Sequence, residues 1–324
     1  MPDSLLTPEL LRRLEQFQLL AARRAKSSAK GERRSRARGQ SVEFADYRNY
    51  VPGDDFRYLD WNLFARLDRL FLKLYEEERE LPVRLFLDAS ESMTFGQPRK
   101  FDFARQVAAA IGYVALCGFD RVSVNVFPNG ERAANGADDQ RPPTGSDTPH
   151  SALRTPQLET AARGALRAVR GKKSALQFFH NLGALTAGGP VNFNEAVRRG
   201  ALEARQPGLA VVLSDCLDPE GYEAGLNALI GRGFQVDVVQ ILAPDELAPT
   251  TFGDLRLVDA ESGDVREVTF GKFRLKAYQQ TVQHFCGRLR EFCAGRGINY
   301  FLASSDMDLG ELLLKQLRQA EVLG

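Results

Sequence analysis

Residues 81–93 read Leu81-Pro82-Val83-Arg84-Leu85-Phe86-Leu87-Asp88-Ala89-Ser90-Glu91-Ser92-Met93. The first half is a short, mostly apolar run that ends at Asp88, which is typical of a strand buried in a sheet. Residues 101–118 follow with a pattern that is apolar nearly all round, and they predict a buried helix. A strand, a loop and a helix in this order indicate the start of an α/β domain.

The same alternation continues along the chain. Further strands are predicted at residues 122–127, 209–213, 234–242 and 298–302. Helices are predicted at residues 157–169, 174–185, 192–204, 221–232, 272–294 and 309–320. Alternating elements of this length indicate an α/β fold with a mostly parallel sheet and helices on both faces. Residues 253–270 contain two short runs around a glycine turn and are predicted to form a hairpin insertion.

Length and composition describe an ordinary globular protein. The chain has 324 residues, of which 44% are hydrophobic and 26% are charged, so it is neither fibrous nor wholly disordered. We expect an N-terminal helix and basic arm at residues 1–40, an α+β appendage at 41–80 and the α/β domain at 81–324. The helix itself is predicted over residues 7–22. Residues 129–155 are rich in Gly, Pro, Asp and Asn and predict a mobile loop.

Residues 21–38 form the basic arm, with eight basic side chains and a single acidic one, Glu32. Clustered positive charge of this kind suits nucleic acid, an anionic membrane or an acidic protein face. A solvated and partly disordered lead-in explains the same composition equally well. We expect the arm and the 129–155 loop to be the least ordered parts of the chain.

The cysteines and the N-terminus predict a cytoplasmic protein. Cys117, Cys216, Cys286 and Cys293 occur singly, without the close pairs of zinc or redox sites, so we expect reduced thiols. The first 20 residues mix charged residues among the leucines and contain no signal-peptide core. The longest apolar stretch, residues 107–119, is too short for the roughly 20 residues of a membrane span.

A possible metal site follows the first strand of the domain. Asp88, Ser90 and Ser92 place a carboxylate and two hydroxyls at alternate positions, so one turn can aim all three oxygens at a single point. Asp215 follows the 209–213 strand, and carboxyl ends of parallel strands gather at one edge of a sheet. Oxygen ligands of this kind suit Mg²⁺ or another divalent cation.

These residues resemble the metal-ion-dependent adhesion motif of von Willebrand factor A domains. The resemblance implies that Asp88, Ser90, Ser92 and the later Asp215 surround a cation. The family also supplies a threonine from an intervening loop, commonly after a glycine pair, but this chain has Val191 at that place. Because valine cannot coordinate a metal, Asn192 or Thr186 is a possible substitute ligand, and metal affinity is reduced if neither serves.

The stretch at residues 43–61, with residues 65–66, 77–79 and 257–263, strongly resembles the bacterial domain-of-unknown-function 58 family. Members of that family resemble von Willebrand factor A domains and often occur beside MoxR-type AAA+ ATPases. The resemblance therefore implies a protein partner of that class. Read as chemistry, the appendage offers arginines and aspartates for an ion-paired clasp that ties it to the core, with the candidates Arg48, Asp54, Asp55, Arg57, Asp60 and Arg66.

Signatures of enzymes are missing from the sequence. Phosphatases of the haloacid dehalogenase type need an acid two residues after the first aspartate, where this chain has Ser90. Neither a nucleophile elbow nor a P-loop is present. The prediction is a non-catalytic adaptor or chaperone-associated protein that binds its partner through the adhesion-like site. Binding of nucleic acid or an anionic membrane by residues 21–38 is the alternative, and a metal-dependent hydrolase is a weaker one.

Overall fold

A computed structural model describes residues 5–17, 19, 42–77, 80–128, 165–190, 192–249, 253–258, 265–313 and 322. The chain divides into two compact units, Ala22–Glu80 and a larger one formed by Leu81–Gly324 together with Met1–Ala21. The N-terminal helix thus belongs to the larger unit, whereas the sequence grouped it with the basic arm. The segments expected to be mobile, the arm at residues 21–40 and the 129–155 loop, lie outside the described residues.

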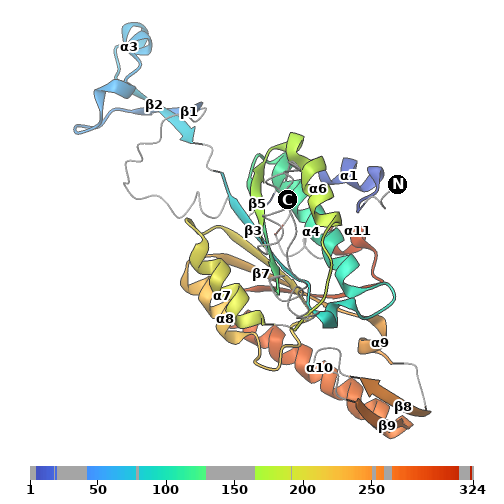
Figure 1. Ribbon diagram of the computed structural model, residues 1–324. Helices are drawn as coiled ribbons and strands as arrows, with labels where there is room; N and C mark the ends of the chain where they lie inside the picture. Colours follow the sequence, from blue (N-terminus) through green and yellow to red (C-terminus); the bar gives the residue numbers. More distant parts are fainter. Residues whose placement is uncertain are drawn as a thin grey trace, which may run out of the picture. The chain divides into compact units, whose positions relative to one another are not determined.

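The larger unit is built on a six-stranded sheet with the order β10-β7-β6-β3-β4-β5 (Figure 1). Its strands are β3 (Pro82–Asp88), β4 (Arg121–Phe127), β5 (Ala165–Arg170), β6 (Leu209–Ser214), β7 (Gln235–Leu242) and β10 (Asn299–Ser304). All neighbours pair in parallel except β5, which runs antiparallel to β4 at the edge. The predicted α/β fold with a mostly parallel sheet is confirmed.

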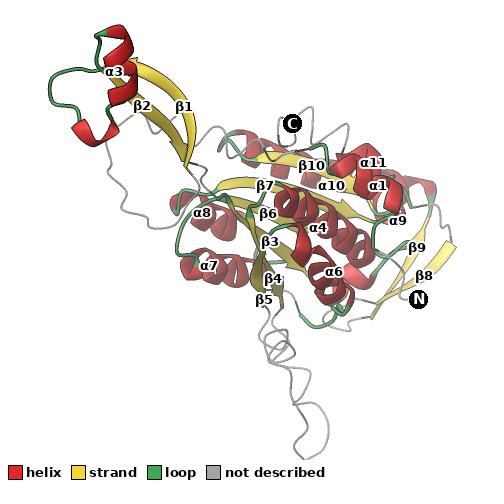
Figure 2. Cartoon of the chain, turned by 90° about the horizontal axis from the view of Figure 1, so that it is seen from above, coloured by secondary structure: helices red, strands yellow, loops and turns green. Residues whose placement is uncertain are grey.

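Helices cover both faces of the sheet because its central strands are apolar on both sides. On one face lie α4 (Lys100–Cys117) and α6 (Ala175–Gly183), and on the other lie α7 (Phe193–Glu203) and α8 (Glu223–Gly231) (Figure 2). The long helix α10 (Lys272–Ala294) joins the second face through its buried Leu289 and Cys293. None of the helices in the described parts of the chain is long and apolar enough to cross a membrane.

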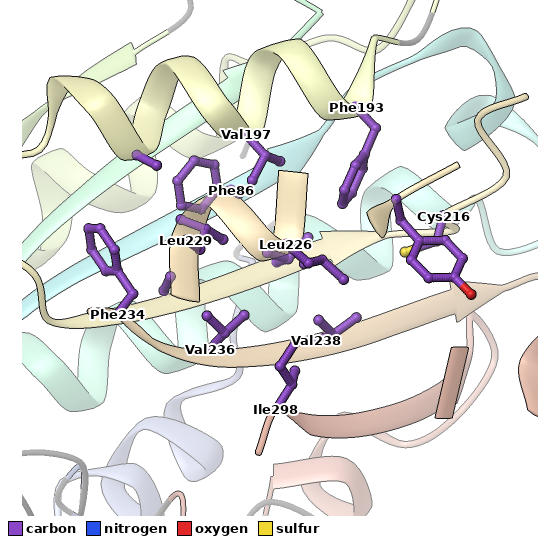
Figure 3. Packing of buried hydrophobic residues seen from close by; sticks show 14 of the residues in the cluster. Phe86, Phe193, Val197, Cys216, Leu226, Leu229, Phe234, Val236, Val238 and Ile298 are labelled. Carbon is purple, nitrogen blue, oxygen red and sulfur yellow. The ribbon is translucent and has the colours of Figure 1, made fainter. Parts of the chain in front are cut away.

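On the face covered by α7 and α8, the strand register determines which side chains form the core. Phe86, Val212 and Val238 occupy one row across three strands and face the same side. Side chains of the two helices pack over this row (Figure 3). Each fully buried aliphatic or aromatic side chain of this kind contributes about 1.5–3 kcal/mol. Burial on both faces fixes the strand ends, where the candidate site lies.

The smaller unit is a two-stranded antiparallel sheet of β1 (Val42–Asn49) and β2 (Phe71–Glu77). A 3-10 turn, η1 (Phe56–Tyr58), and the helix α3 (Trp61–Leu67) connect the strands. Asp60 caps α3, since its Oδ1 accepts hydrogen bonds from the Asn62 and Leu63 N–H groups. Asp68 ends the helix in the left-handed conformation, at φ 52°.

Several predicted elements change in extent or type. Residues 165–169 were expected to be helical, but they form the edge strand β5, because pairing with β4 outweighs a short helical pattern. The N-terminal helix α1 (Pro8–Leu14) starts at the expected Thr7 cap but ends well before residue 22. The hairpin is confirmed as β8 (Gly253–Val258) and β9 (Val265–Phe270). The last helix, α11, spans Leu309–Glu311, and residues 314–320 of the predicted helix lie outside the described residues.

Substitution of Gly112 tests the close packing of α4 on α6, and substitution of Gly287 in α10 serves as its control. A Cβ at Gly112 in α4 would lie 2.3 Å from Phe178 Cε1, whereas a Cβ at Gly287 in α10 would meet nothing within 4 Å. We expect Gly112→Ala to destabilise the protein by about 1–3 kcal/mol through overpacking. Gly287→Ala should stabilise it by up to about 1 kcal/mol through helix propensity. Thermal unfolding of both variants measures these effects. Equal melting temperatures for Gly112→Ala and Gly287→Ala would contradict the close contact between α4 and α6.

Candidate functional site

The candidate site lies where two neighbouring parallel strands end. β3 ends at Asp88, and Asp215 directly follows β6. The strands pair in register with Leu87 opposite Leu213, so both carboxylates emerge at the same edge of the sheet. From β3 the chain proceeds to β4 on one side, while β6 lies on the other. Open α/β sheets bind ligands at such a switch point.

A series of hydrogen bonds joins the four predicted ligands. Ser90 Oγ lies 3.1 Å from Ser92 Oγ, and Ser92 Oγ donates to Asp215 Oδ2 at 2.9 Å. Asp88 accepts hydrogen bonds from the Ser90 N–H at 2.9 Å and from Ser214 Oγ at 2.6 Å. The structure therefore brings Asp88, Ser90, Ser92 and Asp215 together at one edge of the sheet.

The loop after β3 is held in place by its own sequence. A 3-10 turn, η2 (Glu91–Thr94), begins directly after Ser90, and Thr94 Oγ1 donates to the Glu91 carbonyl at 2.7 Å. Met93 is fully buried and anchors the turn in the core. A short turn with one apolar anchor leaves little freedom for the serine side chains, so their hydroxyls are positioned before any ligand arrives.

The glycine pair expected to precede the threonine position lies against this loop. The Gly188 N–H donates to the Ala89 carbonyl at 2.7 Å, and the Glu91 N–H donates to the Gly189 carbonyl at 2.9 Å. Gly189 has a φ of 93°, which only glycine adopts without strain. Val191, which follows this pair, lies outside the described residues. The loop therefore contacts the motif through its backbone.

The two possible substitute ligands have different surroundings. Asn192 caps α7, because its Oδ1 accepts the Glu195 N–H at 3.2 Å and its Nδ2 donates to Glu195 Oε2 at 2.7 Å. Thr186 is exposed. Within the described residues, the hydrogen bonds found for the Asp88, Ser92 and Asp215 side chains go to other partners. Neither substitute ligand is thus joined to the cluster.

Sequence reasoning missed two residues of the site, Lys100 and Glu246. Lys100 Nζ lies 2.8 Å from Asp215 Oδ2 and 2.7 Å from Glu246 Oε1. Lys100 is the first residue of α4 and its side chain is fully buried, and Glu246 belongs to the short helix α9 (Pro244–Leu247) after β7. A lysine at the start of a helix that is apolar nearly all round was the available signal, since buried lysines are paired.

Further hydrogen bonds hold both the main chain and the side chain of Asp215. Its carbonyl accepts a hydrogen bond from Gln240 Nε2 at 3.0 Å, and Gln240 Oε1 accepts one from Tyr300 Oη at 2.7 Å. Gln240 is fully buried in β7. The Leu217 N–H donates to Asp215 Oδ1 at 3.0 Å. Buried hydrogen bonds of this kind restrict the orientation of the group they support.

The electrostatics of the site follow from burial. Loss of solvent, and next the negative charge of Asp215, raise the pKa of Asp88 to about 7, although hydrogen bonds from Ser214 and Ser90 act in the opposite direction. Burial lowers the pKa of Lys100, but the carboxylates of Asp215 and Glu246 more than offset this effect, so the net shift is upward. Lys100 is therefore a permanent cation in contact with Asp215.

The donor set fits a small divalent cation. Neighbouring ligands of an octahedral Mg²⁺ ion, each at about 2.1 Å, are roughly 3 Å apart. The spacings of 3.1 Å between Ser90 Oγ and Ser92 Oγ and 2.9 Å between Ser92 Oγ and Asp215 Oδ2 match that edge. Among the described residues, no group of three or more His, Cys, Asp and Glu side chains suits a metal. A divalent cation at this place would need the serine hydroxyls among its ligands.

The ion pairs found in the appendage join its own residues. Arg48 binds Asp54 through both guanidinium ends at 2.8 and 2.7 Å, and Arg57 Nη2 lies 2.6 Å from Asp55 Oδ2. Asp60 accepts a hydrogen bond from Tyr47 Oη at 2.9 Å besides capping α3. Arg66 is exposed. These contacts stabilise the turns of the smaller unit. The predicted clasp between the appendage and the core stays a prediction.

Comparison with known proteins finds relatives along most of the chain. Uncharacterized proteins of Mycobacterium tuberculosis and Mycobacterium bovis are each 31% identical over 268 residues, which cover 80% of this chain and 74% of the relative. An uncharacterized protein of Mycobacterium avium is 36% identical over 75 residues, covering 23% of this chain and 42% of the relative.

Two solved structures are distantly similar. BatB, a conserved hypothetical protein from Bacteroides thetaiotaomicron, has a TM-score of 0.39 at 15% identity. An aerotolerance-related membrane protein from Bacteroides fragilis has a TM-score of 0.40 at 17% identity. Each alignment covers 74% of this chain and 98% of the other.

A family model, described as protein of unknown function DUF58, matches residues 46–153. The match runs from the appendage through β3 and the Asp88 to Ser92 loop into α4 and β4. Together with the similarity to the mycobacterial proteins over most of both lengths, it shows that the chain belongs to the DUF58 family.

Proposed function

We propose that this chain is a non-catalytic protein-binding protein of the von Willebrand factor A type. Asp88, Ser90, Ser92 and Asp215 hold a divalent cation such as Mg²⁺, and the cation binds a carboxylate of a partner protein. The observation that carries the proposal is the oxygen chain from Ser90 through Ser92 to Asp215, with its octahedral spacing. When bound, the cation supplies an open coordination position for an acidic side chain.

The surroundings of the oxygen cluster favour a protein as the ligand. Phe95, just after the 3-10 turn, is 50% exposed, and Leu217, two residues after Asp215, is 44% exposed. Large apolar side chains beside a polar centre are typical of protein-binding surfaces, where they exclude water around the central contact. A partner with an acidic residue and apolar neighbours fits this face.

The contacts of the hydroxyls also favour binding over catalysis. A nucleophilic serine needs a base that accepts its proton and that a third group orients. Ser92 donates to Asp215 Oδ2, but the Lys100 ammonium already donates to the same oxygen. His180 in α6 and His284 in α10 are both exposed, and the hydroxyls of the cluster bond to other groups. A metal-dependent hydrolase is therefore the weaker proposal.

The partner class comes from the family resemblance. We infer an AAA+ ATPase of the MoxR type, with both proteins acting in the cytoplasm. The four cysteines are free thiols, which agrees with a reducing compartment. The alternative, binding of nucleic acid or an anionic membrane by the basic arm, concerns residues 21–38, which lie outside the described residues and stay a prediction.

Loss of Asp88 should weaken partner binding. Asp88→Ala removes a carboxylate that orders the motif loop, and contacts of this strength contribute on the order of 2 kcal/mol or more. We expect the affinity for the purified MoxR-type ATPase of the source organism to fall at least about tenfold in Mg²⁺. Glu291→Ala, which removes an exposed acid of α10, is the matched control. Equal binding by wild type and Asp88→Ala, with and without chelator, removes this site from the mechanism.

The raised pKa of Asp88 predicts an unusual pH dependence in chelator. The folded pKa of about 7 exceeds the unfolded value of about 3.9, so between these pH values the folded state holds the extra proton. Stability from this group is therefore greatest at low pH and is lost as the pH rises through about 7.

Asp88→Asn cannot titrate, so its melting temperature should fall less than that of wild type between pH 5 and pH 8. Added Mg²⁺ should restore wild type at pH 8, because the cation favours the ionised carboxylate. Differential scanning fluorimetry in the two buffers measures both effects. Parallel pH profiles of the two proteins would show that Asp88 does not titrate in this range.

A further inference from the structure

The buried ion pairs of Lys100 carry an inference about the cation site itself, which rests on the proposed function. Lys100 Nζ bridges Asp215 Oδ2 at 2.8 Å and Glu246 Oε1 at 2.7 Å, so these carboxylate oxygens lie no more than 5.5 Å apart. The Lys100 side chain is fully buried and Asp215 is 2% exposed. Charges that are this poorly solvated interact strongly with any ion bound nearby.

We propose that the Lys100–Glu246 pair sets the charge of the site and thereby its affinity for a divalent cation. Lys100 is a resident cation that holds Asp215 in place when no metal is bound. Glu246 compensates part of that positive charge, so that the site stays negative enough to accept a metal. Both residues lie outside the Asp88–Ser92 motif and act on the affinity for the cation through their charges.

The charges at the site support this assignment. Asp88, Asp215 and Glu246 contribute three carboxylates, and Lys100 contributes one ammonium, which leaves a formal charge of minus two when all are ionised. One divalent ion balances that charge. Removing Lys100 makes the site more negative, removing the charge of Glu246 makes it less negative, and removing both restores the original charge.

Glu246 also connects the site to the next turn of the fold. Its Oε2 accepts the Ala243 N–H at 2.7 Å, which closes the first turn of α9 after β7. The contacts of Lys100 with Asp215 and Glu246 therefore tie three elements together at the sheet edge: the start of α4, the end of β6 and α9. These pairs hold the site in the absence of a metal.

The size of the effect follows from Coulomb's law. Even with the dielectric constant of water, a unit charge about 5 Å from a divalent ion changes its binding by more than about tenfold. Burial reduces the screening, so this is a lower bound for Lys100. Glu246 is less buried, with 17% of its side chain exposed, and its charge should matter less.

The test is a double-mutant cycle in the full-length protein, with Mg²⁺ binding measured by isothermal titration calorimetry. Relative to wild type, Lys100→Met should bind Mg²⁺ at least about tenfold more tightly and Glu246→Gln about threefold to tenfold more weakly. The Mg²⁺ affinity of the double variant should lie between those of the two single variants, since the two charge changes oppose each other.

Lys172→Met is the matched control for loss of a lysine. Lys172 pairs with Glu15 at 2.8 Å, and Glu15 also accepts a hydrogen bond from Tyr113 Oη. Tyr113 lies 13 positions after Lys100 in α4, or about 20 Å along the helix. That separation is about two Debye lengths at physiological salt, so this variant should bind Mg²⁺ like wild type.

Stability gives a second readout. In chelator, Lys100→Met leaves two carboxylates without their cation and should melt below wild type, and Mg²⁺ should raise its melting temperature more than that of wild type. If Lys100→Met does not fold, Glu246→Gln decides alone: weaker Mg²⁺ binding supports the proposal, and unchanged or tighter binding overturns it.

The proposal is also overturned if Lys100→Met binds Mg²⁺ no more tightly than wild type, or if neither protein binds it. A double variant whose Mg²⁺ affinity lies outside the range set by the two single variants overturns it as well. Failure of the proposed function looks different, because Mg²⁺ affinities then follow the predicted order while the ATPase binds wild type and Asp88→Ala equally.

Discussion

The parallel pairing of β3 with β6 is the constraint on which the candidate site depends. The two strands are separated by more than a hundred residues of sequence, yet Leu87 lies opposite Leu213. A slip of one residue would turn each side chain of β6 to the other face of the sheet, and the buried rows on both faces exclude this. Burial of apolar side chains therefore sets the position of Asp215 relative to Asp88.

Polar groups at this edge are stabilised by one another and not by solvent. Asp88 is fully buried and Asp215 nearly so, and each carboxylate oxygen accepts a hydrogen bond from a neighbouring group. A buried charge without a partner costs several kcal/mol, and the ion pair between Lys100 and Asp215 at 2.8 Å gives each of these two buried groups its partner.

Much of the fold was predictable because its signals are local. The apolar run of residues 82–87, the helical patterns that became α4, α7 and α10, and the Thr7 cap each follow from periodicity or from one side chain. The exception is instructive. Residues 165–169 carry a helical pattern, but β5 forms because the open edge of β4 offers backbone hydrogen bonds that a short helix cannot match.

The residues of the candidate site likewise fall into those that local sequence patterns predict and those that they do not. Short-range patterns, with the rule that strand ends share an edge, were sufficient to predict the α/β architecture, the loop with Asp88, Ser90 and Ser92, and Asp215 at the end of a later strand. Lys100 and Glu246, which contact each other beside Asp215, became visible only in the folded structure. Their contact joins residues 146 positions apart, and its cause is desolvation, which depends on what surrounds a group in three dimensions. The sequence marks Lys100 at the start of an apolar helix but does not indicate its partners.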